Sequence, residues 1–479
     1  MTASDTAFGQ MAMSKQSLAS VVVEDDGFSS AAIGGEVCSM RGFLLNLFRL
    51  LDEYGVNYCV LHSWDCLPEN LTSDLDLAVH PRDKHKLLLV FEQLRSKEYV
   101  CFQRLNHSIN GHFFVFCWAE ESGVKTAAVD LVFDHRRSGL ILATGEEMVE
   151  GRRRHREFWI PSKKIEFGYL LAKKAWKGKT PERQSTRLRE LAEALGEAEA
   201  ERIAGTVFSG KWKKQAVRAC LNESLATDVV GARRQFWRTG WTRRPLQSAG
   251  FLITNYARLI WREVRPSGIH VAVMGPDGVG KSTVIAGLID CLGLGFWRRN
   301  KLFHWRPQAL FVKRDQTINP DPHGKPARGS LLSMAYLSAF FLDHWVGYIF
   351  KVRPALGRAN FVIFDRYFHD VLVDPRRYRY GGPSWYAKFL AGMAPEPDVV
   401  ILLDADEHAI AARKCEVPLL EIKSQLQKYR ALQFQRTPKI VVDTQSGIEA
   451  TLRSSSQAIT EIMGLRVRNR LRSWQEKAS

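Results

Sequence analysis

The stretch Val271-Ala-Val-Met-Gly275-Pro-Asp277-Gly-Val-Gly280-Lys281-Ser-Thr283 joins an apolar run to a glycine-rich turn of the form G-x-x-x-x-G-K-S. Residues 269–274 predict a buried strand, and apolar residues recur behind the turn at helical spacing (Val284, Ile285, Leu288, Ile289 and Leu292). A turn of this kind points successive backbone N–H groups and the positive end of a helix at one place. The stretch therefore predicts a loop that binds the phosphates of a nucleotide.

The loop residues have expected roles toward ATP and Mg²⁺. Lys281 would reach the β and γ phosphates, and Ser282 would ligate the metal ion. The other expected contacts with ATP come from Gly275, Gly278, Val279, Gly280 and Thr283. The plain alternative is a glycine-rich turn that binds no ligand.

Length and composition indicate a globular protein of two or three domains, because 479 residues exceed the size of one ordinary core. The eight cysteines are scattered without a C-x-x-C pair, which fits a reducing cytoplasm and suggests neither a disulfide framework nor a zinc site. The net charge of +17 implies anionic partners such as nucleotides, nucleic acid or a lipid surface. A soluble protein with a basic surface is the plainer interpretation.

We expect five segments. Residues 1–38 are rich in Ser, Ala and Gly and predict a disordered tail without the pattern of a signal peptide. Residues 39–160 form a first domain, 161–267 a basic helical region, 268–463 a second domain and 464–479 a basic tail. Leucines at helical spacing (Leu188, Leu191 and Leu195) predict helices across residues 161–206.

The first domain carries acidic residues at two predicted strands. Alternation in Asp74-Leu-Asp76-Leu-Ala-Val puts two carboxylates on one face, and Asp130 lies in a later strand. Neighbouring carboxylates repel each other unless a cation or a proton lies between them, which favours a divalent metal. Alternatives are solvated aspartates at an exposed strand end, or a degenerate nucleotide-binding fold.

This set resembles the nucleotidyltransferase superfamily, in which a Ser after the first strand precedes the D-x-D pair by eleven positions. Ser63, Asp74, Asp76 and Asp130 match that plan, although the family's Gly-Ser is His62-Ser63 here. The resemblance covers about residues 40–160 and implies an α+β domain. It also implies that the three carboxylates hold Mg²⁺ ions that orient a triphosphate and an attacking hydroxyl.

Residues 207–267 interleave basic and aromatic side chains. The basic ones are Lys211, Lys213, Lys214, Arg218, Arg233, Arg234, Arg238, Arg243, Arg244, Arg258 and Arg262, and the tryptophans are Trp212, Trp237, Trp241 and Trp261. Such a helix can lie on an anionic membrane or clamp nucleic acid. The plainer interpretation is a helical linker whose arginine stems pack on its neighbours.

The longest apolar segment, Leu331–Phe350, contains Asp343 and His344, so we predict a helix packed on a sheet rather than a transmembrane helix. Further strands are expected at 302–305, 361–364, 399–403 and 439–442, alternating with helices. This order predicts an α/β fold with a doubly wound parallel sheet and ligands at the carboxyl ends of its strands. Asp365, at one such end, would hold Mg²⁺ through water.

The same residues resemble the thymidylate kinase family of P-loop nucleoside monophosphate kinases. The matching features are Gly275 to Thr283, Asp365-Arg366-Tyr367 and Pro397 to Asp406, followed by Arg413, over about residues 268–463. The resemblance implies catalytic roles for Lys281, Asp365 and Arg366, with Arg366 gripping the acceptor phosphate beside Tyr367. It implies that Asp277 faces the acceptor sugar, Arg306 touches the acceptor phosphate and Arg413 lies over the adenine.

The chain departs from this family where Asp370 replaces a Ser and where Arg376 and Arg377 precede two tyrosines, which suits a highly anionic or ring-bearing acceptor. The combination resembles thymidylate-kinase-like proteins found with bacterial surface-polysaccharide genes. The first hypothesis is an ATP- and Mg²⁺-dependent phosphotransferase acting on a nucleoside monophosphate or similar acceptor. The others are a bifunctional kinase and nucleotidyltransferase, and a nucleotide-gated module on a membrane surface.

Among partners, we expect a nucleotide substrate, an anionic membrane surface contacted through the basic Trp/Arg region, and a second copy in a homodimer. Nucleic acid is not expected. The predicted location is the cytoplasm, peripheral to the membrane.

Overall fold

The computed structural model describes residues 38–120, 123–137, 140–177, 181–208, 211–221, 231, 234, 238, 241–242, 245–296, 300–310, 325–413 and 419–476. The tail expected over residues 1–38 lies outside this set, apart from Cys38. The chain divides into two compact units. We call residues 262–462 the C-terminal unit, and residues 36–261 together with 463–479 the N-terminal unit. The boundaries fall inside two helices, α10 (Pro245–Val264) and α18 (Ile448–Gln475).

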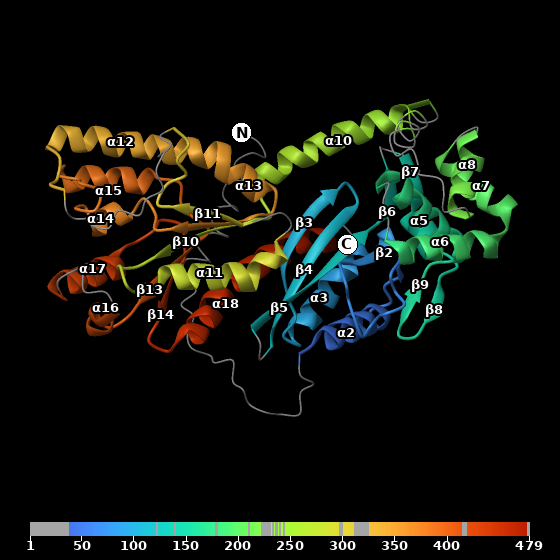
Figure 1. The fold of residues 1–479 in the computed structure, drawn as a ribbon, viewed down its shortest axis with the longest axis horizontal. Coiled ribbons are helices and arrows are strands. Elements are labelled where there is room, and N and C mark those ends of the chain that lie inside the picture. Colours follow the sequence, from blue (N-terminus) through green and yellow to red (C-terminus); the bar gives the residue numbers. More distant parts are fainter. Residues whose placement is uncertain are drawn as a thin grey trace. The chain divides into compact units, whose positions relative to one another are not determined.

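A five-stranded parallel sheet forms the centre of the C-terminal unit (Figure 1). Its order is β11 (Asn300–His304), β12 (Phe361–Asp365), β10 (Ile269–Met274), β13 (Val399–Asp404) and β14 (Lys439–Asp443). All neighbouring pairs are parallel. The middle strand β10 has later strands on both sides, so its carboxyl end is a topological switch point, where ligands bind in such sheets.

Helices cover both faces of this sheet (Figure 1). Ala272 and Met274 of β10 share a core cluster with Leu337 and Leu390, which belong to helices on one face. The elements on that side include α12 (Ser330–Gly347), the π-helical η3 (Tyr348–Val352), α13 (Arg353–Gly357) and α15 (Ser384–Met393). On the other side are α11 (Lys281–Leu292), η2 (Gly293–Gly295) and the start of α18. Shorter pieces are α14 (Asp370–Val373), α16 (Glu407–Arg413) and α17 (Leu419–Ala431).

The sheet of the N-terminal unit is mixed. Its order is β1 (Tyr58–Val60), β2 (Leu75–Val79), β5 (Gly123–Val132), β4 (Gly111–Glu120) and β3 (Val100–Ser108). Only the pair β2 and β5 is parallel, and its register sets Asp76 opposite Asp130. Aspartates from two strands are therefore neighbours on this sheet.

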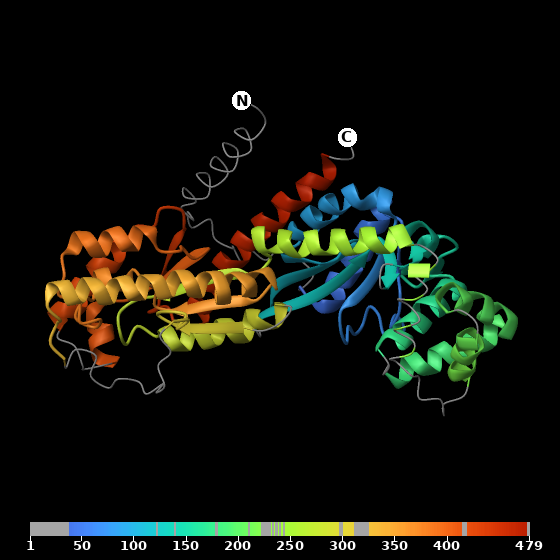
Figure 2. The same cartoon turned by 90° about the horizontal axis from the view of Figure 1, so that it is seen from above.

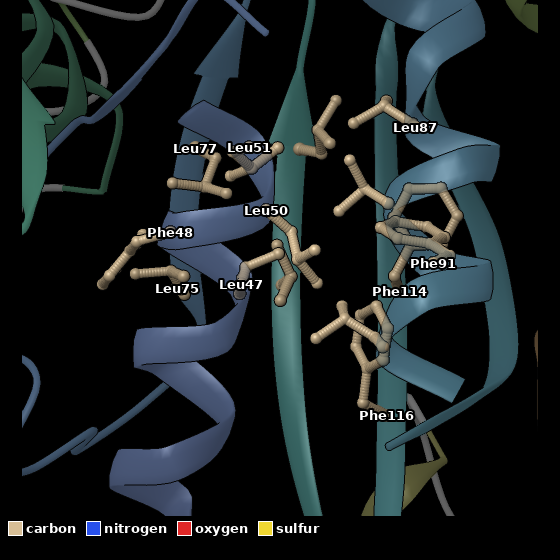
Figure 3. Packing of buried hydrophobic residues seen from close by; sticks show 14 of the residues in the cluster. Leu47, Phe48, Leu50, Leu51, Leu75, Leu77, Leu87, Phe91, Phe114 and Phe116 are labelled. Carbon is tan, nitrogen blue, oxygen red and sulfur yellow. The ribbon is translucent and has the colours of Figure 1, made fainter. Parts of the chain in front are cut away.

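Two helices, α2 (Met40–Glu53) and α3 (Leu87–Arg95), bury their apolar stripes against this sheet (Figure 3). Figure 3 shows Leu47 and Leu50 of α2 near Leu75 of β2, and Phe91 of α3 near Phe114 of β4. The Ser39 hydroxyl caps α2 by accepting from the Gly42 N–H. The amphipathic pattern of α2 and α3 therefore reflects the packing of their apolar sides against the sheet.

The last turns of α18 complete the same core, because Val467 and Leu471 are buried in it and Trp474 packs against it. Residues 464–479 were expected to form a separate basic tail, whereas the structure continues α18 through Gln475. Among its basic side chains, Arg472 is exposed, whereas Arg468 lies 2.8 Å from Glu92 of α3.

Helices also form across residues 161–206, as predicted: α5 (Lys163–Lys177), α6 (Glu182–Leu195) and α7 (Glu197–Val207), followed by α8 (Lys211–Leu221). Leu188 and Leu191 are buried with Phe167 in a second core of the N-terminal unit. The remaining elements are η1 (Pro81–Lys86), α4 (Gly145–Val149) and two hairpins, β6 (Asp134–Arg137) with β7 (Leu140–Thr144) and β8 (Arg153–His155) with β9 (Phe158–Ile160).

The predicted strands of the C-terminal half are confirmed, and β10 begins and ends where expected. The apolar segment 331–350 forms α12 and most of η3. None of the described helices is long and apolar enough to cross a membrane. Within this segment Asp343 and His344 are buried, whereas Leu331, Leu342 and Phe350 are exposed.

Three buried histidines of the C-terminal unit lie among aromatic rings. Burial lowers the pKa of His270 to about 4, of His344 to about 3 and of His369 to about 4. Among the described residues, neither ring nitrogen of His270 has a hydrogen-bond partner. Each ring is therefore neutral in the folded state.

This neutrality predicts acid lability. The pKa of each histidine is lower in the folded state than in the unfolded state. The free energy of unfolding is therefore highest above about pH 6.5 and decreases as the pH falls toward 4. Three such groups should lower the free energy of unfolding by up to about 4 kcal/mol per pH unit in that window. Urea unfolding at a series of pH values measures this slope.

The variant His270→Leu should reduce the slope by about 1.4 kcal/mol per pH unit. His408→Leu, at an exposed position of the same unit, is the matched control and should leave the slope unchanged. Equal slopes for the wild type and His270→Leu would contradict the assignment.

Candidate functional site

The glycine-rich turn follows the carboxyl end of β10 and leads directly into α11. Gly275 has a φ of 148°, and a Cβ there would lie 2.8 Å from the Leu403 carbonyl oxygen. Gly280, at the start of α11, has a φ of 101°. Both conformations favour glycine, so the loop glycines allow a backbone path that other residues would strain. Val279 is buried beneath the turn, whereas Ser282 and Thr283 are exposed at the first turn of α11.

Lys281 curls back over the loop. Its Nζ donates to the carbonyl oxygens of Gly275 at 2.9 Å and Pro276 at 2.7 Å, and lies 3.6 Å from Asp277. Burial, together with the charge of Arg366, lowers the pKa of Lys281 to about 7. A buried ammonium at the N-terminus of a helix is a place where an anion would be stabilised.

Three cationic side chains converge on Asp277. Arg366 and Arg377 each donate to one carboxylate oxygen of Asp277, and Lys281 lies beside it. Burial alone would raise the pKa of Asp277, but Arg366, Lys281 and Arg377 outweigh it and hold this pKa well below its usual range. The carboxylate thus lies where three positive charges from β10–α11, β12 and the segment after α14 meet.

Arg366 is held from its other side by Asp370. One Arg366 Nη donates to Asp370 at 2.8 Å and to the Tyr429 hydroxyl at 3.1 Å. Asp370 also accepts from the hydroxyls of Tyr378, at 2.7 Å, and Tyr429. Both charged groups are nearly inaccessible to solvent, with 2% exposure for Arg366 and 0% for Asp370. The fork of Arg366 is therefore preorganised.

Asp365, at the end of β12, has the properties expected of a residue that binds Mg²⁺ through water. Its Oδ2 lies 3.1 Å from His304 Nδ1, and its buried Oδ1 has no hydrogen-bond partner among the described residues. Burial would raise the pKa of Asp365, but the His304 hydrogen bond and the charge of Lys281 outweigh it and lower this pKa. An ionised, incompletely satisfied carboxylate fits a hydrated divalent cation.

Two residues that were expected to bind the acceptor, Tyr367 and Arg306, do not contact the Asp277 cluster in the described residues. Tyr367 is a core residue with 1% exposure, and its hydroxyl donates to the Pro395 carbonyl oxygen; its acceptor role stays a prediction. Arg306 is buried and donates to Asp343 at 2.9 Å, a carboxylate that also accepts the N–H groups of Ala309 and Leu310. Arg306 is thus held by α12 rather than by the Asp277 cluster.

The two adjacent arginines differ. Arg377 contacts Asp277, whereas Arg376 is exposed. The side chain of Arg413 lies outside the described residues.

In the N-terminal unit, Asp74, Asp76 and Asp130 each place a carboxylate oxygen within 4.8 Å of the others. Parallel pairing of β2 with β5 produces this cluster, because it sets Asp76 opposite Asp130. Three carboxylates at such spacing can hold a divalent cation. Ser63, at the end of the first strand region, has a φ of 58° and lies 2.8 Å from His62 Nδ1 through its hydroxyl.

Basic side chains of the same unit already contact two of these carboxylates. Asp76 pairs with His62 and lies 3.7 Å from Lys173, and Asp130 lies 2.7 Å from His107. Burial would raise the pKa of Asp76, but His62 and Lys173 lower it; burial raises the pKa of Asp130, against the His107 hydrogen bond. Lys173 therefore supplies positive charge beside Asp76, where a metal would also provide it.

Several partners of the site residues were not predicted from the sequence. Tyr429 beside Arg366 and Lys173 beside Asp76 gave no local signal, and the pairing of Arg366 with Asp370, four residues further on, was not predicted. For Arg306 the sequence did carry a signal. Asp343 is a charged residue inside an apolar helix, and a buried charge requires a partner of opposite charge.

The buried pair of Arg366 and Asp370 yields a stability prediction. Asp370→Ala leaves a buried guanidinium without its second carboxylate, so the free energy of unfolding should fall by about 3 to 5 kcal/mol. Asp290→Ala, at an exposed position on α11, is the control and should change it by less than about 0.5 kcal/mol. Urea unfolding monitored by circular dichroism measures both, and a loss below about 1 kcal/mol for Asp370→Ala would contradict the role of the pair.

Comparison with known proteins identifies distant relatives. A thymidylate kinase of Xanthomonas campestris pv. campestris is 26% identical over 217 residues, covering 43% of this chain and 89% of the relative. A probable thymidylate kinase of Caldivirga maquilingensis is 29% identical over 162 residues, covering 32% of this chain and 71% of the relative. No family model matches the chain.

Among solved structures, the chain is similar to JHP933 from Helicobacter pylori, with 11% identity, a TM-score of 0.24, and coverage of 46% of this chain and 97% of the other. A TM-score of this size carries no argument about the fold. The sequence relatives support a thymidylate kinase-like region in this chain and a phosphotransferase of the nucleotide kinase type.

Proposed function

We propose that the C-terminal unit transfers the γ-phosphoryl group of ATP, with Mg²⁺, to the phosphate of a nucleoside monophosphate or a related phosphorylated acceptor. The observation that carries this proposal is the convergence of Lys281, Arg366 and Arg377 at the carboxyl ends of the central strands, beside the glycine-rich turn. The similarity to thymidylate kinases supports the same class of reaction.

The charge of each side chain indicates its proposed role in binding the substrates. The backbone of the turn from Gly275 to Gly280 and Lys281 would hold the triphosphate, while Ser282 and Asp365 would hold hydrated Mg²⁺. Bound Mg²⁺ would neutralise charge on the phosphates. Arg366 would align the acceptor phosphate, whose oxygen attacks the γ-phosphorus as the bond to the β-phosphate breaks. Such a transfer needs alignment and charge neutralisation rather than a strong base.

Asp277 has a second part in this proposal. A phosphate dianion would compete with the Asp277 carboxylate for Arg366 and Arg377, because both anions need the same N–H donors. Release of Asp277 from these arginines would leave its carboxylate able to accept a hydrogen bond from an acceptor hydroxyl. An acceptor that combines a phosphate with a sugar hydroxyl fits both demands.

The test is release of ADP from Mg-ATP against a panel of nucleoside monophosphates. Lys281→Ala should lose phosphoryl transfer and weaken ATP binding, whereas Arg366→Ala should lose at least about a hundredfold in turnover with ATP affinity largely kept. Arg358→Ala, at an exposed position outside the cluster, is the matched control. Normal turnover by Arg366→Ala would refute the acceptor assignment.

The adjacent arginines provide a finer prediction about the acceptor. Arg377→Ala should lower kcat/KM for the acceptor by about tenfold or more, because it removes a charged donor from the cluster. Arg376→Ala should lower it by less than about threefold, since this side chain is exposed. Steady-state kinetics with varied acceptor decide between them, and equal losses would place both side chains on the substrate.

A second candidate function concerns the N-terminal unit. We propose nucleotidyl transfer there, supported by the proximity of Asp74, Asp76 and Asp130. In this proposal a divalent cation bound by the three carboxylates would displace His62 and His107 from them.

The two activities can be separated by mutation. Asp130→Asn should abolish transfer of label from an α-labelled nucleoside triphosphate, and Asp76→Asn should leave ADP release by the C-terminal unit unchanged. Lys281→Ala is the reciprocal control, with label transfer kept and ADP release lost. No label transfer by the wild type with Mg²⁺ or Mn²⁺, over a panel of sugar and protein acceptors, would exclude this second activity.

A further inference from the structure

Helix α10 is one continuous helix (Figure 2), and the side chains on one of its faces are uncharged and exposed to solvent. Leu246, Ile253 and Ile260 follow one another at seven-residue spacing, and their exposed fractions are 88%, 71% and 67%. Gly250 and Ala257 lie between them on the same face and are also exposed. These five positions form an aliphatic strip with one glycine over four turns, and the exposed Thr254, Tyr256 and Trp261 flank it.

The polar side of α10 faces the protein. Arg258 donates to the Asn106 carbonyl oxygen at 2.6 Å and to the Asn255 side chain at 2.8 Å, and Ser248 is 1% exposed. A surface helix of a soluble protein has the opposite arrangement, with its apolar stripe on the core. An aliphatic strip of this length that is left in water indicates a surface that contacts an apolar partner.

The sequence just before α10 indicates which partner. Residues 231–244 contain five arginines, Phe236, Trp237 and Trp241, and no acidic residue. In the part that the structure describes, Arg234 and Arg238 are exposed and Trp241 is 42% exposed. Positive charge and aromatic rings beside an aliphatic strip match the two layers of an anionic membrane surface, namely the headgroups and the outer acyl region.

Other occupants fit less well. Two copies that paired in parallel through α10 would bring their arginine-rich segments together without compensating charge. Nucleic acid would contact the arginines through its phosphates, but its bases stack on aromatic rings and would not bury the isoleucines.

We propose that α10 is an interfacial helix that docks this protein on an anionic lipid bilayer, with its aliphatic face in the lipid and the exposed Arg234 and Arg238 among the headgroups. The helix lies along the surface and does not cross it, because its other side carries Arg258 and Asn255 in contact with the protein. This inference goes beyond the proposed phosphotransfer and does not depend on it.

The test is co-sedimentation of the full-length protein with vesicles of phosphatidylcholine containing about 30% phosphatidylglycerol, compared with pure phosphatidylcholine. The wild type should bind the anionic vesicles at least about tenfold more tightly, with weaker binding at high salt. The double variant Ile253→Asp with Ile260→Asp should lose at least about tenfold in binding. Leu89→Asp, at an exposed leucine of α3, is the matched control and should bind as the wild type does.

Equal unfolding midpoints for these proteins would establish that the variants fold. A second variant, Arg234→Glu with Arg238→Glu, should weaken binding to anionic vesicles and reduce its salt dependence. Absence of wild-type binding to the anionic vesicles, or equal binding by the isoleucine variant, would overturn the proposal. So would a wild-type dimer in lipid-free solution that the isoleucine variant converts to monomer, because a second copy would then cover this face.

Discussion

The buried guanidinium of Arg366 is the constraint on which the C-terminal unit depends. A charge removed from water is tolerated only when donors and acceptors are matched, and here Asp370 and Asp277 take opposite sides of the fork. Tyr378 and Tyr429 complete the acceptors' hydrogen bonds, which ties the segment after β12 to α17. The network stabilises a geometry suited to an anion at the cost of desolvating several charges.

In both units, carboxylates lie close to basic side chains of the same unit. Asp277 lies among Lys281, Arg366 and Arg377, while Asp76 and Asp130 lie beside His62, Lys173 and His107. Like charges this close would otherwise repel each other. Ligands that bind at either place would have to exchange partners with these internal ion pairs, which favours charged ligands over neutral ones.

Exposed apolar surface on this protein is concentrated on particular helices. On α10 the aliphatic strip faces solvent while Arg258 faces the protein, and on α12 Leu331 and Leu342 are exposed while Asp343 is buried with Arg306. In both helices a polar contact inside the protein fixes which side turns outward. Hydropathy along the chain therefore does not by itself identify the buried face.

The sequence by itself determined the strand, turn and helix around Gly275 to Ser282, the parallel α/β sheet and the strand-end position of Asp365, because these depend on periodicity and on residues adjacent in the chain. It did not predict β4, whose first eight residues are all buried and so show no alternation. Only the tertiary structure decided the polar contacts of Arg366 with Tyr429 and of Lys173 with His62, which join residues that are 63 and 111 positions apart. Partners so distant in the chain are selected by packing, which leaves no local pattern.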